Sequence, residues 1–125
     1  MTSLVRTITF DCADPETVGR FWAAVTGRDL DVDHDEPDAM IAGADGQPHL
    51  LFLPVPEGKT VKNRVHLDLQ PTDRGRDEEV ERLLGLGARL HSDHRRPDGT
   101  GFVVLADPED NELCVERSAT ERGGG

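Results

Sequence analysis

Hydrophobic and polar residues alternate strictly over residues 5–12, near the start of the chain. The apolar positions of this run are Ile8, Phe10 and Cys12. The polar positions between them are Thr7, Thr9 and Asp11. Because successive side chains of a strand point to opposite faces, the pattern predicts a strand with one face on an apolar core.

A helix is predicted directly after this strand. Asp14 is a good N-cap, Pro15 suits the first helical position, and Gly27 suits the end of the helix. Four apolar residues between them follow the spacing i, i+3, i+4, i+7, namely Val18, Phe21, Trp22 and Val25. This stripe predicts a helix packed on the sheet, with Trp22 in the core rather than stacked on a ligand.

Residues 31–38 form an acidic stretch whose spacing of aspartates resembles the start of a calcium-binding loop. The rest of the pattern does not match, because Glu36 occupies the position of the required glycine and Ala42 the position of the final glutamate ligand. We therefore expect a solvated loop or an edge strand here. Two short strands are predicted next, near residues 39–42 and 50–55, with a turn at Asp45-Gly46 between them.

The second half of the chain repeats the first. Residues 64–70 alternate again, with Val65, Leu67 and Leu69 apolar and His66, Asp68 and Gln70 polar. A helix starting near Asp77, a strand beginning at residues 88–90, a loop over 91–101 and strands over 102–106 and 113–116 follow. The two halves start 59 residues apart. The repeat predicts a single α+β domain over residues 1–125, built from two β-α-β-β-β modules at about 4–57 and 61–118, with a flexible tail over 119–125.

Three sequence blocks carry a resemblance to a known family. They are residues 10–15 with Phe21-Trp22, residues 61–69, and residues 101–114. In this order they resemble the glyoxalase-like superfamily, also called the vicinal oxygen chelate superfamily, which includes glyoxalase I, extradiol dioxygenases, fosfomycin-resistance enzymes and bleomycin-resistance proteins. The likeness is strongest to bacterial glyoxalase-like domain proteins. It implies curved mixed sheets around a cavity with the helices outside, the polar strand faces lining the cavity, and a homodimer.

The resemblance also locates a metal site, which metal-using members build from His, Glu or Gln on the first and last strands of each module. Of the four positions only His66 matches. The other three are Thr7, Cys114 and a place within residues 50–53 that offers no ligand. One matched ligand does not hold a catalytic ion, so a divalent metal is disfavoured and no cofactor is predicted.

The candidate ligand-binding residues are the polar side chains of the predicted cavity face. They are Thr9, Asp11, His66, Asp68, Cys114 and Glu116. His66, flanked by carboxylates, is the candidate catalytic residue as a general acid or base, and the alternative is a hydrogen-bonded histidine without a catalytic role. A nucleophilic His66–Cys114 pair requires contact that the sequence does not show. His91 and His94 have metal-like spacing, but we expect them on a solvated loop.

Composition narrows the function classes. The formal net charge of −11 argues against nucleic acid and anionic membranes as partners, because both need a basic surface. No window approaches the roughly 18 apolar residues of a membrane span, and the start lacks a signal-peptide pattern. Two cysteines in apolar runs suit a reducing compartment, so a cytoplasmic protein is expected.

Two functions remain open from the sequence. The first is a metal-free protein that binds a small molecule, and carboxylates at Asp11, Asp68 and Glu116 suit a cationic or amphipathic ligand. The second is a lyase or isomerase of the glyoxalase type, either metal-dependent or using His66 as general acid or base. Metal analysis of the purified protein distinguishes them.

Overall fold

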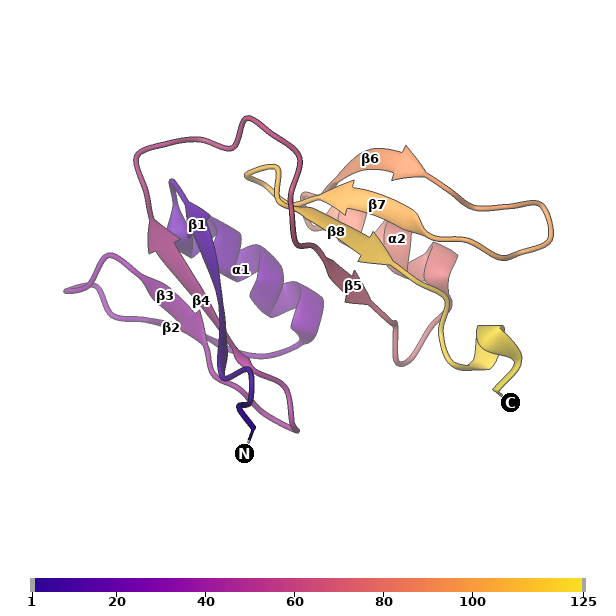
Figure 1. Cartoon of the computed structure of the whole chain (residues 1–125), viewed down its shortest axis with the longest axis horizontal. Helices are drawn as coiled ribbons and strands as arrows, with labels where there is room; N and C mark the ends of the chain where they lie inside the picture. The colour runs from indigo at the N-terminus through magenta and orange to yellow at the C-terminus, as the bar shows by residue number, and fades with distance from the viewer. Residues whose placement is uncertain (1, 125) are drawn as a thin grey trace. The chain divides into compact units, whose positions relative to one another are not determined.

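The computed structural model describes residues 2–124 (Figure 1). The chain divides into two compact units, the first ending at Gly58 and the second beginning at Lys59. Each unit has the order β-α-β-β-β and holds one four-stranded mixed sheet with a helix against one of its faces (Figure 1). The predicted α+β fold of two β-α-β-β-β modules is confirmed.

The first unit contains one helix and four strands. They are β1 (Thr7–Cys12), α1 (Pro15–Thr26), β2 (Leu30–Val32), β3 (Ala39–Ile41) and β4 (His49–Pro54). The strand order is β1-β4-β3-β2, with β1 parallel to β4 and the other pairs antiparallel. A parallel neighbour requires a crossover connection, and α1 with the β2–β3 hairpin provides it.

Helix α1 begins and ends as the sequence predicts. The Asp14 side chain accepts a hydrogen bond from the Thr17 backbone N–H at 3.2 Å, and Gly27 takes the left-handed conformation at φ 69°. Trp22 is only 1% exposed and lies 5.0 Å from Phe10 between ring centroids. The prediction that Trp22 belongs to the core is therefore confirmed.

The register of the first sheet separates a buried face from an open one. Phe52 and Ile41, on the face packed under α1, are fully buried. Thr9 pairs with Leu51 and Leu51 with Met40, which places these three side chains in one row on the opposite face. We call this side of each sheet, away from its helix, the open face. The acidic stretch begins as edge strand β2, where Asp31 pairs with Met40.

The second unit contains an equivalent set of elements and a short C-terminal helix. They are β5 (Leu67–Leu69), α2 (Arg76–Gly85), β6 (Arg89–Asp93), β7 (Val103–Ala106), β8 (Glu112–Val115) and the π-helical turn η1 (Thr120–Gly124). The sheet order β5-β8-β7-β6 repeats that of the first unit, with β5 parallel to β8. Leu83 of α2 and Leu105 and Leu113 of the sheet are fully buried, so they form the core of this unit.

Two strand predictions in the second unit are wrong. The strand expected over residues 64–70 is confined to Leu67–Leu69, and Val65 is 77% exposed rather than packed under the helix. The loop expected from residue 91 begins later, because β6 continues to Asp93. A bulge between Leu90 and Ser92 interrupts the pairing with β7. This irregularity removes the alternation that would have revealed a strand.

The C-terminal residues, for which the sequence predicts a flexible tail, carry specific contacts. The Glu121 carboxylate accepts hydrogen bonds from the backbone N–H groups of Arg76 at 2.7 Å and Ser118 at 2.9 Å. These contacts attach η1 to the first turn of α2. Gly125 lies outside the described residues.

Candidate functional site

The open face of the second sheet carries a row of side chains that crosses all four strands. Asp68 of β5 pairs with Cys114 of β8, Cys114 with Val104 of β7, and Val104 with Ser92 of β6. His66 lies just before β5 and adds to this row. The backbone pairing thus fixes which polar groups can meet on this face.

His66, Asp68 and Cys114 form a compact cluster. The His66 Nδ1 atom lies 3.0 Å from Asp68 Oδ1 and 3.6 Å from Cys114 Sγ. Cys114 is 6% exposed, whereas the His66 and Asp68 side chains are 40% and 50% exposed. Burial, and then the negative charge of Asp68, raise the pKa of the Cys114 thiol to about 11. The resting thiol is therefore protonated and not an activated nucleophile.

A pocket of about 310 Å³ opens over this cluster. Its lining includes His66, Cys114, His91, His94, Lys62 and Phe102. The bulge explains how two consecutive residues, His91 and Ser92, both line the pocket, because it breaks the alternation of β6. His94 lies just beyond the strand and stacks on Phe102 with ring centroids 4.7 Å apart.

Glu112 of β8 binds the chain segment 59–63, which leads into this pocket. Its side chain is 2% exposed and accepts hydrogen bonds from the Asn63 backbone N–H at 2.9 Å, Lys59 Nζ at 3.2 Å and Lys62 Nζ at 3.3 Å. The Asn63 hydrogen bond, helped by the two ammonium groups, lowers the pKa of Glu112 to about 2. Glu112 is therefore an anion at neutral pH, and it keeps Lys62 at the pocket.

The hairpin between β6 and β7, which carries His94 and Phe102, is anchored to α2. Arg76 is 5% exposed, and its Nη1 atom donates to the carbonyl oxygens of Gly99, Thr100 and Gly101 at 3.0 to 3.2 Å. Gly101 has φ 98°, and an added Cβ would clash with the His94 carbonyl oxygen. A glycine is therefore required where this hairpin closes.

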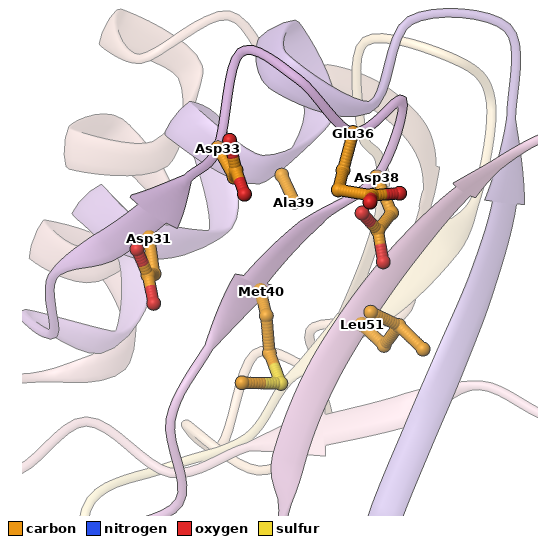
Figure 2. Close-up of a pocket in the computed structure, with 7 residues that line it drawn as sticks. All are labelled: Asp31, Asp33, Glu36, Asp38, Ala39, Met40 and Leu51. Atoms are coloured by element: carbon orange, nitrogen blue, oxygen red, sulfur yellow. The ribbon is translucent and has the colours of Figure 1, made fainter.

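The first unit has a separate pocket on its own open face, with a volume of about 170 Å³. Figure 2 shows four carboxylate side chains to the left of and above the apolar side chains of Met40 and Leu51. The four acidic residues are Asp31, Asp33, Glu36 and Asp38. The pocket joins a negatively charged rim to an apolar floor, a combination that suits an amphipathic cation.

The structure distributes the six candidate residues over both units. His66, Asp68 and Cys114 are brought together in the second unit. Glu116 lies one residue beyond β8 and forms an ion pair with Arg122 at 2.8 Å. Thr9 and Asp11 are exposed on the open face of the first sheet, where Thr9 pairs with the pocket residue Leu51.

Several pocket residues do not follow from the sequence. Its pattern places His91 and His94 on a solvated loop, and it does not single out Lys62, Phe102 or Glu112 as site residues. The only signal for the two histidines is their spacing, which becomes meaningful once β6 and its bulge are known.

Comparison with known proteins places this architecture in a family. The model of the glyoxalase-like domain matches residues 7–116, and the chain therefore belongs to the glyoxalase-like domain family. A comparison with curated proteins gave no significant match.

Solved structures with the same fold come from several bacteria. A fosfomycin resistance protein from Mesorhizobium loti is 18% identical, with a TM-score of 0.71 and 100% of both chains covered. A variant of the fosfomycin resistance protein from Listeria monocytogenes, in complex with Mn(II) and 1S,2S-dihydroxypropylphosphonic acid, is 15% identical, with a TM-score of 0.71 and coverage of 98% of this chain and 94% of that chain. A lactoylglutathione lyase from Agrobacterium tumefaciens is 18% identical, with a TM-score of 0.63 and coverage of 92% and 93%. At these identities the likeness shows the fold alone.

The residues of this chain do not fit the four-ligand metal site that the superfamily resemblance implies. On β1 the family position is Thr7, and on β4 residues 50–53 supply only leucine and phenylalanine. Leu50 and Phe52 are buried in the core of the first unit and carry no donor atom. Such a site would keep only two donors from the second unit, His66 and Cys114, and the thiol replaces a carboxylate.

Proposed function

We propose that this protein binds a small amphipathic molecule with a positive charge, and that it does so without a catalytic divalent ion at the family's metal position. The observation that supports this most directly is the pocket of the first unit, where four carboxylates lie beside an apolar floor (Figure 2). We further propose that it acts in the cytoplasm as a homodimer, with no nucleic acid or membrane partner. The helices in the described part of the chain are too short or too polar to cross a membrane.

Charge and apolar surface act on different parts of such a ligand. Met40 and Leu51 offer half-buried apolar surface to an alkyl or aromatic group. A cationic group above them is attracted by the surrounding carboxylates, each by about 1 kcal/mol at 4 Å in a water-like dielectric. The predicted residues Thr9 and Asp11 belong to the same open face, and Asp11 adds one more negative charge there.

The second unit contributes the other predicted binding residues. Asp68 is a half-exposed carboxylate beside His66, and Cys114 closes the bottom of the pocket there. We propose His66, Asp68, Cys114 and Glu116 as ligand-binding residues of this unit, with the carboxylates of Asp68 and Glu116 favouring a cation. Asp68→Asn should then weaken binding of a cationic ligand while changing stability little.

A binding experiment with charge-matched ligands tests the proposal. A short-chain alkyl trimethylammonium ion, its neutral isostere and its carboxylate counterpart are titrated into the protein, and binding is followed by NMR chemical shifts. Asp31→Asn and Asp33→Asn should each weaken binding of the cation by about fivefold. Glu57→Gln is the control, because this exposed residue lies outside the pocket.

Two outcomes would contradict the proposal. One is equal or tighter binding of the anionic probe, including a phosphonate of the kind bound by the fosfomycin resistance protein described above. The other is binding of the cation that is unaffected by both aspartate substitutions.

A second candidate function is a lyase or isomerase reaction of the glyoxalase type, with His66 as general acid or base. The observation in its favour is the 3.0 Å contact between His66 Nδ1 and Asp68 Oδ1. A proton on Nδ1 shared with this carboxylate leaves Nε2 free to accept or donate a proton. His66→Gln should abolish turnover of such a substrate with little change in its affinity; retained turnover would exclude His66 as the general acid or base, and no turnover by the unaltered protein would exclude this function.

A further inference from the structure

We propose that the first unit carries a second binding site, at one end of its sheet, for a small amphipathic anion such as a short-chain carboxylate. A pocket of about 660 Å³ lies there, between the segment that precedes β1 and the turn that joins β3 to β4. Its lining comes from residues 4–6, 43, 44 and 46–49. None of these residues lines either of the two pockets described above, so the site goes beyond the proposed function, which concerns a cation.

The backbone brings the two walls of this pocket together. In the parallel pairing of β1 with β4, Thr7 lies opposite His49, and the His49 N–H donates to the Arg6 carbonyl oxygen at 2.9 Å. In the turn itself, the Gln47 N–H donates to the Ala44 carbonyl oxygen at 2.9 Å. Main-chain hydrogen bonds therefore hold both walls, and the site lies where β1 and β4 begin rather than on the open face of the sheet.

Part of the pocket offers exposed apolar surface. Leu4 and Val5 are 80% and 71% exposed, and Pro48 adds to the same lining. Apolar side chains in water gain free energy when an alkyl or aromatic group covers them. An occupant with an apolar part therefore suits this wall.

The charge at this pocket is opposite to that of the acidic pocket. Arg6 is exposed in the lining, and its guanidinium group forms no ion pair with a carboxylate within residues 2–124. The lining, as far as the structure describes it, contains no aspartate or glutamate, and Asp45 at the tip of the turn is not part of it. In a chain with a net charge of −11, such a pocket favours an anion.

His49 adds a hydrogen-bond donor to the same pocket. Its Nδ1 atom accepts a hydrogen bond from the Gly43 N–H at 2.9 Å. Because an accepting Nδ1 carries no proton, the proton of the neutral ring is on Nε2, which is then a donor. The side-chain amide of Gln47, also in the lining, is a further donor. A carboxylate can accept hydrogen bonds from the guanidinium, imidazole and amide groups, whereas a quaternary ammonium group can accept none.

Titration of the full chain with hexanoate, hexanol and hexyltrimethylammonium, followed by amide NMR shifts, tests the site. Hexanoate should shift the amides of residues 4–6 and 43–49, hexanol should bind there more weakly, and the cation should leave these amides unchanged. Since one guanidinium group attracts an anion less strongly than four carboxylates attract a cation, hexanoate should bind here more weakly than the cation binds the acidic pocket.

Substitutions separate the contributions of charge and apolar surface. Arg6→Gln should weaken hexanoate binding by about fivefold, the effect of one unit charge at about 4 Å in water. Leu4→Ser should weaken it by about fourfold, the contribution of about one buried methylene group. Circular dichroism should show both variants folded, because both side chains are exposed.

Two further variants serve as controls. Arg20→Gln also removes an exposed arginine of the first unit, but one that lies outside the pocket lining, and it should leave hexanoate binding unchanged. Asp31→Asn, which tests the acidic pocket, should leave it unchanged as well. Failure of this inference and failure of the proposed function are therefore distinguishable.

The imidazole nitrogens of His49 report on the site directly. A long-range proton–nitrogen NMR spectrum should show the proton on Nε2 in the free protein, and hexanoate should shift Nε2 more than Nδ1. A proton on Nδ1 would contradict the proposed set of donors.

The proposal is overturned if hexanoate and hexanol bind these residues equally well, or if Arg6→Gln leaves the hexanoate affinity unchanged. It is also overturned if Leu4→Ser has no effect on hexanoate binding but converts a dimer into a monomer in light scattering. In that case the exposed apolar surface is a contact between copies of the chain.

Discussion

Replacing Glu112 with glutamine should destabilise the second unit strongly at neutral pH. The pKa of Glu112 falls from 4.5 to about 2 in the folded protein. At about 1.4 kcal/mol per pKa unit, this lowering corresponds to roughly 3 kcal/mol of folding free energy. Lys62 is largely exposed, which weakens its share, so we expect Glu112→Gln to cost about 2–3 kcal/mol at pH 7. A glutamine still accepts the Asn63 hydrogen bond but loses both charged partners.

The pH dependence of this loss gives the sharper test. Since the folded-state pKa lies below the unfolded-state value, the stabilisation is complete above pH 4.5 and disappears as the pH falls towards 2. The difference in unfolding free energy between wild type and Glu112→Gln should therefore shrink to about 1.5 kcal/mol or less near pH 3.

Urea unfolding at pH 7, 5 and 3 measures this difference. Far-ultraviolet circular dichroism is the appropriate signal, because Trp22, the only tryptophan, lies in the first unit. Glu116→Gln is the control, since its ion pair with Arg122 is exposed and should contribute under about 1 kcal/mol. A cost below 1 kcal/mol at pH 7, or one that stays constant from pH 7 to pH 3, would refute the assigned role of Glu112.

Three further predictions concern stability, metal content and assembly. Gly101→Ala should destabilise the protein by more than Gly99→Ala in urea unfolding, because both glycines have positive φ but only the Cβ at 101 meets a carbonyl oxygen; equal costs would show that the hairpin relaxes freely. Elemental analysis after mild dialysis should find well below one equivalent of zinc, nickel or iron, and a near-stoichiometric ion that disappears in His66→Ala would contradict this. Light scattering should give a dimer mass, because edge strands of small sheets tend to be covered; a monomer mass over a wide concentration range would exclude the homodimer.

The elements with regular periodicity could be predicted from the sequence. The alternation ending at Cys12, the cap at Asp14 and the apolar stripe through Trp22 all follow from local geometry, and the structure matches them. The repeat in the second half then gives the module order. These features depend only on the spacing of apolar and polar residues along the chain, and this spacing can be read from the sequence without knowledge of tertiary contacts.

The parts that could not be predicted depend on contacts between distant residues. Val65 continues an alternating pattern but is exposed, because β5 does not start until Leu67. His91 reaches the pocket through a bulge, and a bulge leaves no periodic signal. The burial of Glu112 depends on a segment about fifty positions earlier, around Asn63. The contact of His66 with Cys114 likewise follows from the pairing of β5 with β8.

The attachment of the β6–β7 hairpin to Arg76 has a consequence for local opening of the protein. The Arg76 guanidinium group donates hydrogen bonds to three carbonyl oxygens of the hairpin. The backbone N–H of the same residue donates to the Glu121 carboxylate. Fraying of the first turn of α2 would therefore release the hairpin and the C-terminal turn together. Amide hydrogens at Arg96 and Arg122, which sit in these two segments, should then exchange with solvent through one shared opening event. The wall of the pocket that carries His94 would become mobile in the same event.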